Sequence, residues 1–279
     1  MLNDLTCLND RAILTLSGPD RKNFLQGLIT NDMGKLSSAA VIYAALLTPQ
    51  GKYLHDFFIC EKNETLYLDG ERSRIADLFR RLMMYKLRAD VSLVDASEDY
   101  TVMASPEPLV EGLVSYADPR HSHLGYRTIM AARPANQQSG QQPDQQINAY
   151  DDLRLSLGLP AGSRDFDVDK TLILEGNMAE LGAVDFNKGC YVGQEVTARM
   201  KYRATLKKRL LPIDVDGPLP ARGTIITNEG GKKIGDLRSG QGGRAMGYFR
   251  LADMEFDQKY HCGEAQVSPW KPDWYPKSE

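Results

Sequence analysis

The sequence predicts an α+β fold that ends in a small antiparallel β-barrel. In roughly the first hundred residues, segments with the alternating pattern of half-buried strands are interleaved with segments of helical period. From about Lys207 onward, short strand-like segments follow one another between turns that contain Gly and Pro, a pattern typical of a small barrel or sandwich. The length of 279 residues suggests about two domains, and we place them at residues 1–205 and 206–279.

The elements of the first domain follow from local patterns. Residues 11–16 alternate as a strand does, and residues 17–20 offer a cap and a first-turn proline to a helix that we expect to close at Asn31 and Asp32. A hairpin of residues 41–47 and 54–60 is expected around the turn at 48–51. The next helix is predicted from a cap at Ser73 and an apolar stripe formed by Ile75, Leu78, Phe79, Leu82 and Met83.

Further along the chain, residues 91–94 and 101–103 predict short strands, and residues 133–147 form a polar, Gln-rich stretch that we interpret as a mobile surface loop. Helical periodicity resumes at Tyr150 and ends near Gly158 and Pro160. In the second domain we expect strands at 209–215, 224–227, 233–235 and 245–249. The tail with Trp270 and Trp274 either docks on the barrel or forms an interaction patch.

Composition excludes several classes of protein. A hydrophobic fraction of 42% and a charged fraction of 25% are those of a soluble globular protein, and a net charge of −3 argues against nucleic-acid binding through bulk positive charge. No apolar run is long enough for a membrane span, and no secretory signal is visible. The four cysteines are scattered, so we expect reduced thiols in the cytoplasm. His121 and His123 lack further ligands at a recognisable spacing, and we expect a surface loop and no metal site.

One stretch, residues 188–195 with the sequence Lys-Gly-Cys-Tyr-Val-Gly-Gln-Glu, concentrates reactive groups. A thiol is nucleophilic as a thiolate, which a nearby cation such as Lys188 and a helix N-terminus would both stabilise. The residues after Gly193 are mostly good helix formers, so Cys190 is expected just before or within the first turn of a helix. The alternative is a buried, inert cysteine in an ordinary turn, but two glycines and charges of both signs make packing alone a costly explanation.

The same octapeptide resembles the signature of the YgfZ family of folate-binding proteins, which are related to the glycine-cleavage T protein and linked to iron–sulfur cluster assembly or repair. Residues 24–32 also resemble the opening of both families. The resemblance implies a T-protein-like, split ferredoxin-like folate-binding body with a C-terminal β-barrel. It further implies tetrahydrofolate, or a C1-substituted folate, held between the modules, and iron–sulfur client proteins as partners.

Individual residues take roles through this resemblance. Glu175 matches a glutamate that hydrogen-bonds the pterin edge in T proteins; the alternative is a surface glutamate at a strand end. Asp56 matches an aspartate near the reactive nitrogen of folate, although His55 replaces an acidic residue and Lys52 a glycine of that motif. The other candidates for cofactor contact are Asn177, Tyr191, Gly193, Gln194, Glu195 and Arg199, the last in a basic run that is either a solvated face or a site for the glutamate carboxylates of folate.

Two functions follow, and a third stays open. The first is a folate-binding accessory protein for iron–sulfur proteins, with Cys190, Lys188 and Asp56 as its reactive or proton-transferring groups. The second is a folate-dependent aminomethyltransferase; the partial Asp56 motif weakens it, and the cysteine signature favours the first. The third is a scaffold that has lost folate binding.

Overall fold

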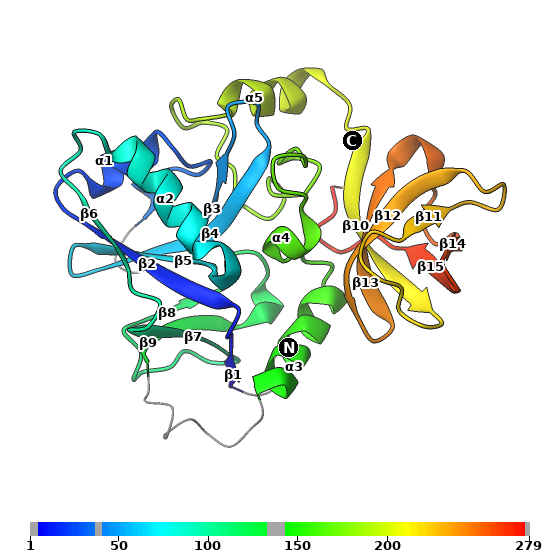
Figure 1. Cartoon of the computed structure of the whole chain (residues 1–279), viewed down its shortest axis with the longest axis horizontal. Helices are drawn as coiled ribbons and strands as arrows, with labels where there is room; N and C mark the ends of the chain where they lie inside the picture. Colours follow the sequence, from blue (N-terminus) through cyan, green and yellow to red (C-terminus); the bar gives the residue numbers. More distant parts are fainter. Residues whose placement is uncertain (1–4, 37–40, 133–142, 277–279) are drawn as a thin grey trace.

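The computed structural model describes residues 5–36, 41–132 and 143–276, the side chains of residues 143–148 excepted. A body with two antiparallel sheets lies beside a closed barrel (Figure 1). The elements are β1 (Thr6–Cys7), β2 (Arg11–Ser17), α1 (Arg21–Gln26), η1 (Met33–Lys35), β3 (Val41–Leu47), β4 (Tyr53–Lys62), β5 (Thr65–Glu71), η2 (Arg72–Arg74), α2 (Ile75–Lys86), β6 (Ser92–Asp95), β7 (Tyr100–Ser105), β8 (Val114–Ala117), η3 (Ser122–Leu124), β9 (Tyr126–Ala131), α3 (Pro143–Ser156), α4 (Gly162–Asp165), α5 (Gln194–Arg203), β10 (Lys208–Asp216), β11 (Ile225–Thr227), β12 (Lys233–Gln241), β13 (Arg244–Arg250), η5 (Leu251–Asp253), β14 (Tyr260–Cys262) and β15 (Ala265–Pro269).

The larger sheet of the body has the order β3-β4-β5-β2-β6, and the smaller one has the order β1-β7-β9-β8. Because side chains alternate along a strand, β4 serves two cores: Phe57 and Ile59 face the core that α2 covers, while Phe58 and Cys60 face the core between the sheets and α3. Asp56 shares the second face with Phe58. This alternation places Asp56 inside the body, away from α2.

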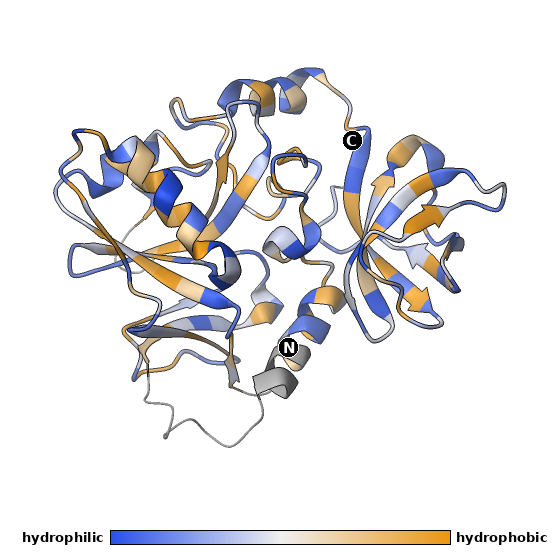
Figure 2. Cartoon of the chain, in the orientation of Figure 1, coloured by the Kyte–Doolittle hydropathy of each residue, from blue (hydrophilic) through white to orange (hydrophobic). Residues whose placement is uncertain are grey.

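The C-terminal barrel closes in the order β10-β13-β12-β11-β14-β15, with antiparallel pairing throughout. Figure 2 shows hydrophilic and hydrophobic residues alternating along its strands, as expected for a barrel filled by side chains. Its interior is apolar and includes Ile213, Leu237 and Phe249. The predicted fold class, an α+β body followed by an antiparallel barrel, is therefore confirmed; the predicted division at residues 205 and 206 stays a prediction.

Several local predictions were wrong. Helix α1 ends at Gln26, well before Asn31, and Ser73 does not cap α2, because its hydroxyl donates to Glu71 2.6 Å away. Of the predicted Gln-rich loop, residues 133–142 lie outside the described residues, while 143–147 begin α3. Proline is compatible with the first turn of a helix, so the composition of this stretch concealed the start of α3.

The tail joins the body and not only the barrel. The indole Nε1 of Trp274 donates to the carbonyl of Leu157 at the end of α3, 2.8 Å away. The backbone N–H of Trp270 donates to the carbonyl of Pro212 in β10. Of the two alternatives for the tail, docking is therefore the one observed, and it ties the end of the described chain to both modules.

Candidate functional site

The cysteine loop rests on the turn between β3 and β4. Gly193 lies at φ +86° immediately before α5, and a Cβ there would lie 2.6 Å from the carbonyl oxygen of Thr48. Gly51, at φ +71°, approaches Val196 of α5 in the same way, since a Cβ there would lie 3.1 Å from the Val196 Cβ. The two glycines thus allow a close contact that side chains would prevent, and the contact fixes the start of α5 on the hairpin.

Cys190 is exposed and lies four residues before the start of α5, in front of the helix and outside its first turn. The other three cysteines are more buried, and burial raises the pKa of each: that of Cys60 to about 12, that of Cys262 to about 11, and that of Cys7 in the same direction. Cys190 is therefore the thiol of this chain that solvent and a partner reach most readily.

Lys188 is buried and its ammonium group donates to the carbonyls of Gln26, Ile29 and Asn31, at 2.7, 2.7 and 2.8 Å. These carbonyls belong to the end of α1 and the segment that follows it. Burial lowers the pKa of Lys188 to about 8. All three ammonium protons are used by the carbonyls, and among the described residues no hydrogen bond joins Lys188 to Cys190. In the structure, Lys188 anchors the cysteine loop to the end of α1 and the segment after it.

The neighbours of Cys190 point in different directions. Tyr191 is buried, its ring lies 5.1 Å from the ammonium of Lys188, and burial raises its pKa to about 12. Gln194 is half-buried in the first turn of α5, while Glu195 and Arg199 are exposed. One side of the loop therefore packs against the body, and the other side faces solvent.

Asp56 is buried and receives two phenol hydrogen bonds, from the hydroxyl of Tyr43 to Oδ2 at 2.9 Å and from that of Tyr53 to Oδ1 at 2.5 Å. Burial raises the pKa of both phenols, and the charge of Asp56 adds to the effect, so both remain donors. The Tyr43 hydroxyl also lies 3.4 Å from the sulfur of Met178. Two tyrosines thus hold the carboxylate of Asp56 in one orientation.

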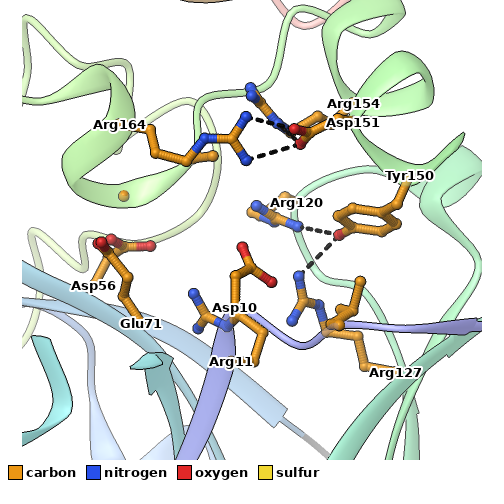
Figure 3. Close-up of a pocket in the computed structure, with 13 residues that line it drawn as sticks. Asp10, Arg11, Asp56, Glu71, Arg120, Arg127, Tyr150, Asp151, Arg154 and Arg164 are labelled. Atoms are coloured by element: carbon orange, nitrogen blue, oxygen red, sulfur yellow. Dashed lines mark hydrogen bonds and ion pairs between the residues drawn. The ribbon is translucent and has the colours of Figure 1, made fainter. Parts of the chain in front are cut away.

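A polar cavity of about 30 Å³ opens beside Asp56, enough for about two water molecules. Figure 3 shows Asp56 and Glu71 on one side of it and Arg11, Arg120 and Arg127 on another. A Cβ on Gly162 would lie 2.7 Å from Glu71 Oε2 and 3.5 Å from Asp56 Oδ1, so glycine at this position leaves room between the two carboxylates and α4. The cavity lining includes neither Cys190 nor Glu175.

The arginines of the cavity are held by buried aspartates. Arg127 donates to Asp69 and Asp118, each at 2.8 Å, and Arg120 forms a two-point contact with Asp118 at 3.0 and 2.7 Å. Both arginines also donate to the hydroxyl of Tyr150 at 2.8 Å. The charge of the arginines holds the pKa of Asp118 well below its usual range. The result is a fixed cationic wall, since buried charges are retained where they are paired.

Glu175 lies at the junction between the body and the barrel. The hydroxyl of Tyr248, in β13, donates to Glu175 Oε2, and the backbone N–H of Leu210 donates to the carbonyl of Glu175 at 2.8 Å. Asn177 is fully buried: its amide N–H donates to the carbonyl of Leu210, and its amide oxygen accepts from Arg209. Glu175 is only half-buried, which leaves Oε1 for another donor.

The structure thus separates the predicted site residues into three places. The cysteine loop and α5 hold Lys188, Cys190, Tyr191, Gly193, Gln194, Glu195 and Arg199. Asp56 lies at the central cavity, and Glu175 and Asn177 lie at the junction with the barrel. Tyr43 and Met178 connect the last two places. The sequence reasoning missed the residues that orient the carboxylates, Tyr43, Tyr53 and Tyr248, and the cavity arginines, because no short motif joins them.

Two structural absences concern the described part of the chain. There, no three His, Cys, Asp or Glu residues gather as a metal site would require. His121 instead contacts Asp273 of the tail at 3.1 Å. Within the same residues, no helix has both the length and the apolar character that crossing a membrane demands.

Comparisons with known proteins fit this architecture. Residues 2–133 match the family model described as GCVT N-terminal domain, and residues 207–277 match the model described as CAF17, C-terminal beta-barrel domain. The chain is 31% identical to the mouse protein named "Iron-sulfur cluster assembly factor IBA57, mitochondrial", over 97% of this chain and 86% of that protein. The chain belongs to the CAF17/IBA57 family. The resemblance to the YgfZ family is thus supported at the level of this wider family.

The chain is also similar to other members of this family and to one solved structure. The human protein of the same name is 31% identical over 96% of this chain and 84% of its own length. The homologue from Coccidioides immitis is 31% identical over 75% of this chain, which spans 56% of that longer protein. The glycine cleavage system aminomethyltransferase T from Bartonella henselae has a TM-score of 0.74 and 15% identity, covering 97% of this chain and 85% of that one. That match shows a shared fold.

The expected cytoplasmic location is contradicted. The relatives from mouse, human and Coccidioides immitis are all named as mitochondrial proteins, which points to the mitochondrion. The expectation rested on four scattered cysteines, taken as reduced thiols. That observation does not distinguish the cytoplasm from other reducing compartments, so it could not support the choice.

Proposed function

We propose that this protein supports the assembly or repair of iron–sulfur cluster proteins, with Cys190 as its working thiol and a tetrahydrofolate-type ligand bound near the junction with the barrel. The observation that carries the proposal is the similarity to IBA57 relatives over nearly the whole chain. Those relatives are named as iron–sulfur cluster assembly factors. We therefore expect iron–sulfur client proteins as partners.

The accessibility of Cys190 supports its part in the proposal. It is the exposed thiol, and its loop is held in place from both sides, by Lys188 on α1 and by Gly193 on the hairpin turn. An exposed thiol on a fixed loop can meet a partner without unfolding the protein. In this proposal Lys188 orients the loop that carries the sulfur.

The donors present also suit a folate. A carboxylate accepts two hydrogen bonds from adjacent N–H groups of a pterin, and Glu175 offers Oε1 while Tyr248 holds Oε2. Asp56 would lie near the folate nitrogen. The side-chain amide of Asn177 is already bonded to Leu210 and Arg209 at the start of the barrel. Asn177 would therefore position Glu175. The cavity beside Asp56, at about 30 Å³, is smaller than a pterin and is not lined by Glu175, so a folate that contacts both carboxylates would require the side chains around this cavity to move.

Calorimetric titration with tetrahydrofolate tests this part. We expect wild type to bind and Glu175→Gln to bind at least tenfold more weakly, because the amide loses the charge-assisted hydrogen bond. Glu264→Gln, the same change at an exposed position of the barrel, is the matched control and should bind within twofold of wild type. No binding by wild type, or equal binding by Glu175→Gln, would remove folate from the proposal.

Rescue in cells tests the iron–sulfur part. In cells depleted of their own IBA57 protein, expression of this chain in mitochondria is expected to restore the activity of iron–sulfur enzymes. No observation on the molecule favours the aminomethyltransferase alternative, because the match to the Bartonella henselae enzyme, at 15% identity, shows the fold alone. Failure of rescue together with turnover of an aminomethyl carrier would favour that alternative.

A further inference from the structure

Helix α5 buries very little of itself. Of its ten residues only Thr197 is buried, and in Figure 1 the helix lies at the outer edge of the body, away from the barrel strands. Isolated helices shorter than about 12 residues are marginal in water, so a helix of this length normally depends on an apolar face packed against the protein. In α5 the hairpin contact at Gly193 and Val196 fixes the first turn, and the outer face is left uncovered.

The uncovered face and the segment after it are strongly basic. Between residues 194 and 209 the only acidic residue is Glu195, in a chain whose net charge is −3. Five cations in this stretch are exposed, and in the described part of the chain none of them forms an ion pair; they are Arg199, Lys201, Arg203, Lys207 and Lys208. Within the described residues, exposed cations elsewhere, such as Arg88 and Lys233, also lack ion pairs, so what sets this surface apart is the concentration of five cations around a single acidic residue.

An aromatic side chain stands among these cations. Tyr202 is 67% exposed, and its ring packs edge-on against Phe186, with 6.2 Å between centroids. Arg199, Tyr202 and Arg203 have the spacing i, i+3, i+4 and therefore share one side of the helix. Tyrosine and arginine are the residues that most often carry the binding energy of protein interfaces. Among the described residues, Tyr202 is the most exposed aromatic side chain.

We propose that this face of α5, defined by Arg199, Tyr202 and Arg203, is the docking surface for an acidic protein, and that the partner is a client that carries or receives an iron–sulfur cluster. The identity of the partner as a client rests on the proposed function; the acidic character of its surface rests on the unpaired cations. Arginine pairs with carboxylates in a two-point geometry, which suits Asp and Glu side chains of a partner.

The position of Cys190 supports this occupant. The exposed thiol lies on the loop that runs directly into α5, so a protein that covers the whole helix would also reach this loop. The contacts of Gly193 with Thr48 and of Gly51 with Val196 fix the helix beforehand, which reduces the entropic cost of binding. The helix spans only about 15 Å and carries Glu195 four residues before Arg199, which fits a compact protein surface better than the backbone of a nucleic acid.

The test measures binding of an oxidised [2Fe–2S] ferredoxin with a strongly acidic surface, and of its cluster-free form, by calorimetry at low salt. We expect both forms to bind wild type, Arg199→Glu/Arg203→Glu to bind at least tenfold more weakly, and Tyr202→Ala at least threefold more weakly. Arg88→Glu/Lys233→Glu makes the same change in net charge at two other exposed positions and should bind within twofold of wild type.

Several results would overturn the docking surface. One is that wild type binds neither form of ferredoxin, and another is that Arg88→Glu/Lys233→Glu loses as much affinity for ferredoxin as Arg199→Glu/Arg203→Glu does. A third is displacement of ferredoxin by tetrahydrofolate hexaglutamate, which would make the face a folate-tail site. Stronger binding of RNA or of phosphatidylglycerol vesicles through the same residues would also overturn it. Rescue of iron–sulfur enzymes in cells is measured separately. Rescue without ferredoxin binding would contradict the docking surface and leave the proposed function standing. Binding of the cluster-free form without rescue would contradict the proposed function and leave the docking surface standing.

Discussion

His55 and Asp56 are consecutive residues with opposite surroundings, because successive side chains of β4 face opposite sides of the sheet. Asp56 faces the two tyrosines of the central cavity. His55 faces α2, where its Nε2 lies 2.9 Å from the carboxylate of Asp77. Burial, with a further contribution from the nearby Arg74, lowers the pKa of His55 from about 6.5 to about 4. The folded protein therefore keeps this imidazole neutral.

We expect the free energy of unfolding to fall as the pH is lowered from about 6.5 to about 4. In this range His55 takes up a proton in the unfolded chain but not in the folded one, so acid favours unfolding, and the difference between the two pKa values corresponds to about 3 kcal/mol at most. Urea denaturation of wild type and His55→Gln at pH 7 and 4.5 checks this. The variant should lose less stability than wild type; an equal loss would contradict the role given to His55.

At the scale of elements, the contact between α5 and the hairpin turn depends on two glycines. Gly193→Ala places a methyl group 2.6 Å from the carbonyl oxygen of Thr48 at a positive φ, so we expect a loss of about 2 to 3 kcal/mol of stability. Gly189→Ala is the matched control: no atom lies within 4 Å of the position its Cβ would take, and it should change stability by less than about 0.5 kcal/mol. The measured quantity is the denaturation midpoint of each variant. Similar midpoints for Gly193→Ala and Gly189→Ala would contradict the close contact at Gly193.

Most elements could be predicted from local patterns because their own residues specify them. The β3–β4 hairpin, α2 and α5 were predicted close to their observed bounds, as were β10, β11 and β13. Strand β12 runs to Gln241, beyond its predicted end at residue 235, and β14 and β15 were not predicted. The error at the end of α1 lies where a distant residue contributes, because Lys188, more than 150 residues away, takes the carbonyls of Gln26 and Ile29. The error at Ser73 is local, because Glu71, two residues earlier, accepts its hydroxyl.

The same limit applies to the candidate site. The signature around Cys190 and the matches at Asp56 and Glu175 could be read from short stretches, and the resemblance supplied the roles proposed for them. The tyrosines around Asp56, the arginines at 11, 120 and 127, and Tyr248 beside Glu175 come from segments that only the folded chain brings together. The anchoring role of Lys188 was likewise hidden, since its partners lie in another element.

At the scale of the whole molecule, Asn177 links the body to the barrel. Its side chain is fully buried between Leu210 and Arg209, and its own backbone has φ +62°, which asparagine tolerates better than most residues. Tyr248 and Trp274 add contacts between the modules. The barrel and the body are therefore expected to unfold together.

Asn177→Ala removes two buried hydrogen bonds and leaves Arg209 without one of its acceptors. We expect a loss of about 3 kcal/mol and, in calorimetry, two separate unfolding transitions in place of one. Asn187→Ala, on an exposed asparagine of the same segment, should leave a single transition at the wild-type temperature. A single, unshifted transition in Asn177→Ala would show that the junction does not couple the modules.

The most direct test of the central claim compares two cysteine variants in cells depleted of their own IBA57 protein. Cys190→Ser removes the exposed thiol, and Cys7→Ser removes another non-buried thiol elsewhere in the body. The measured quantity is the activity of mitochondrial iron–sulfur enzymes at matched protein levels. We predict that wild type and Cys7→Ser restore this activity and that Cys190→Ser restores less than about a tenth of it, because the nucleophilic or metal-ligating thiolate is then missing. Full rescue by Cys190→Ser would contradict the account, because the thiol would then have no part in the function.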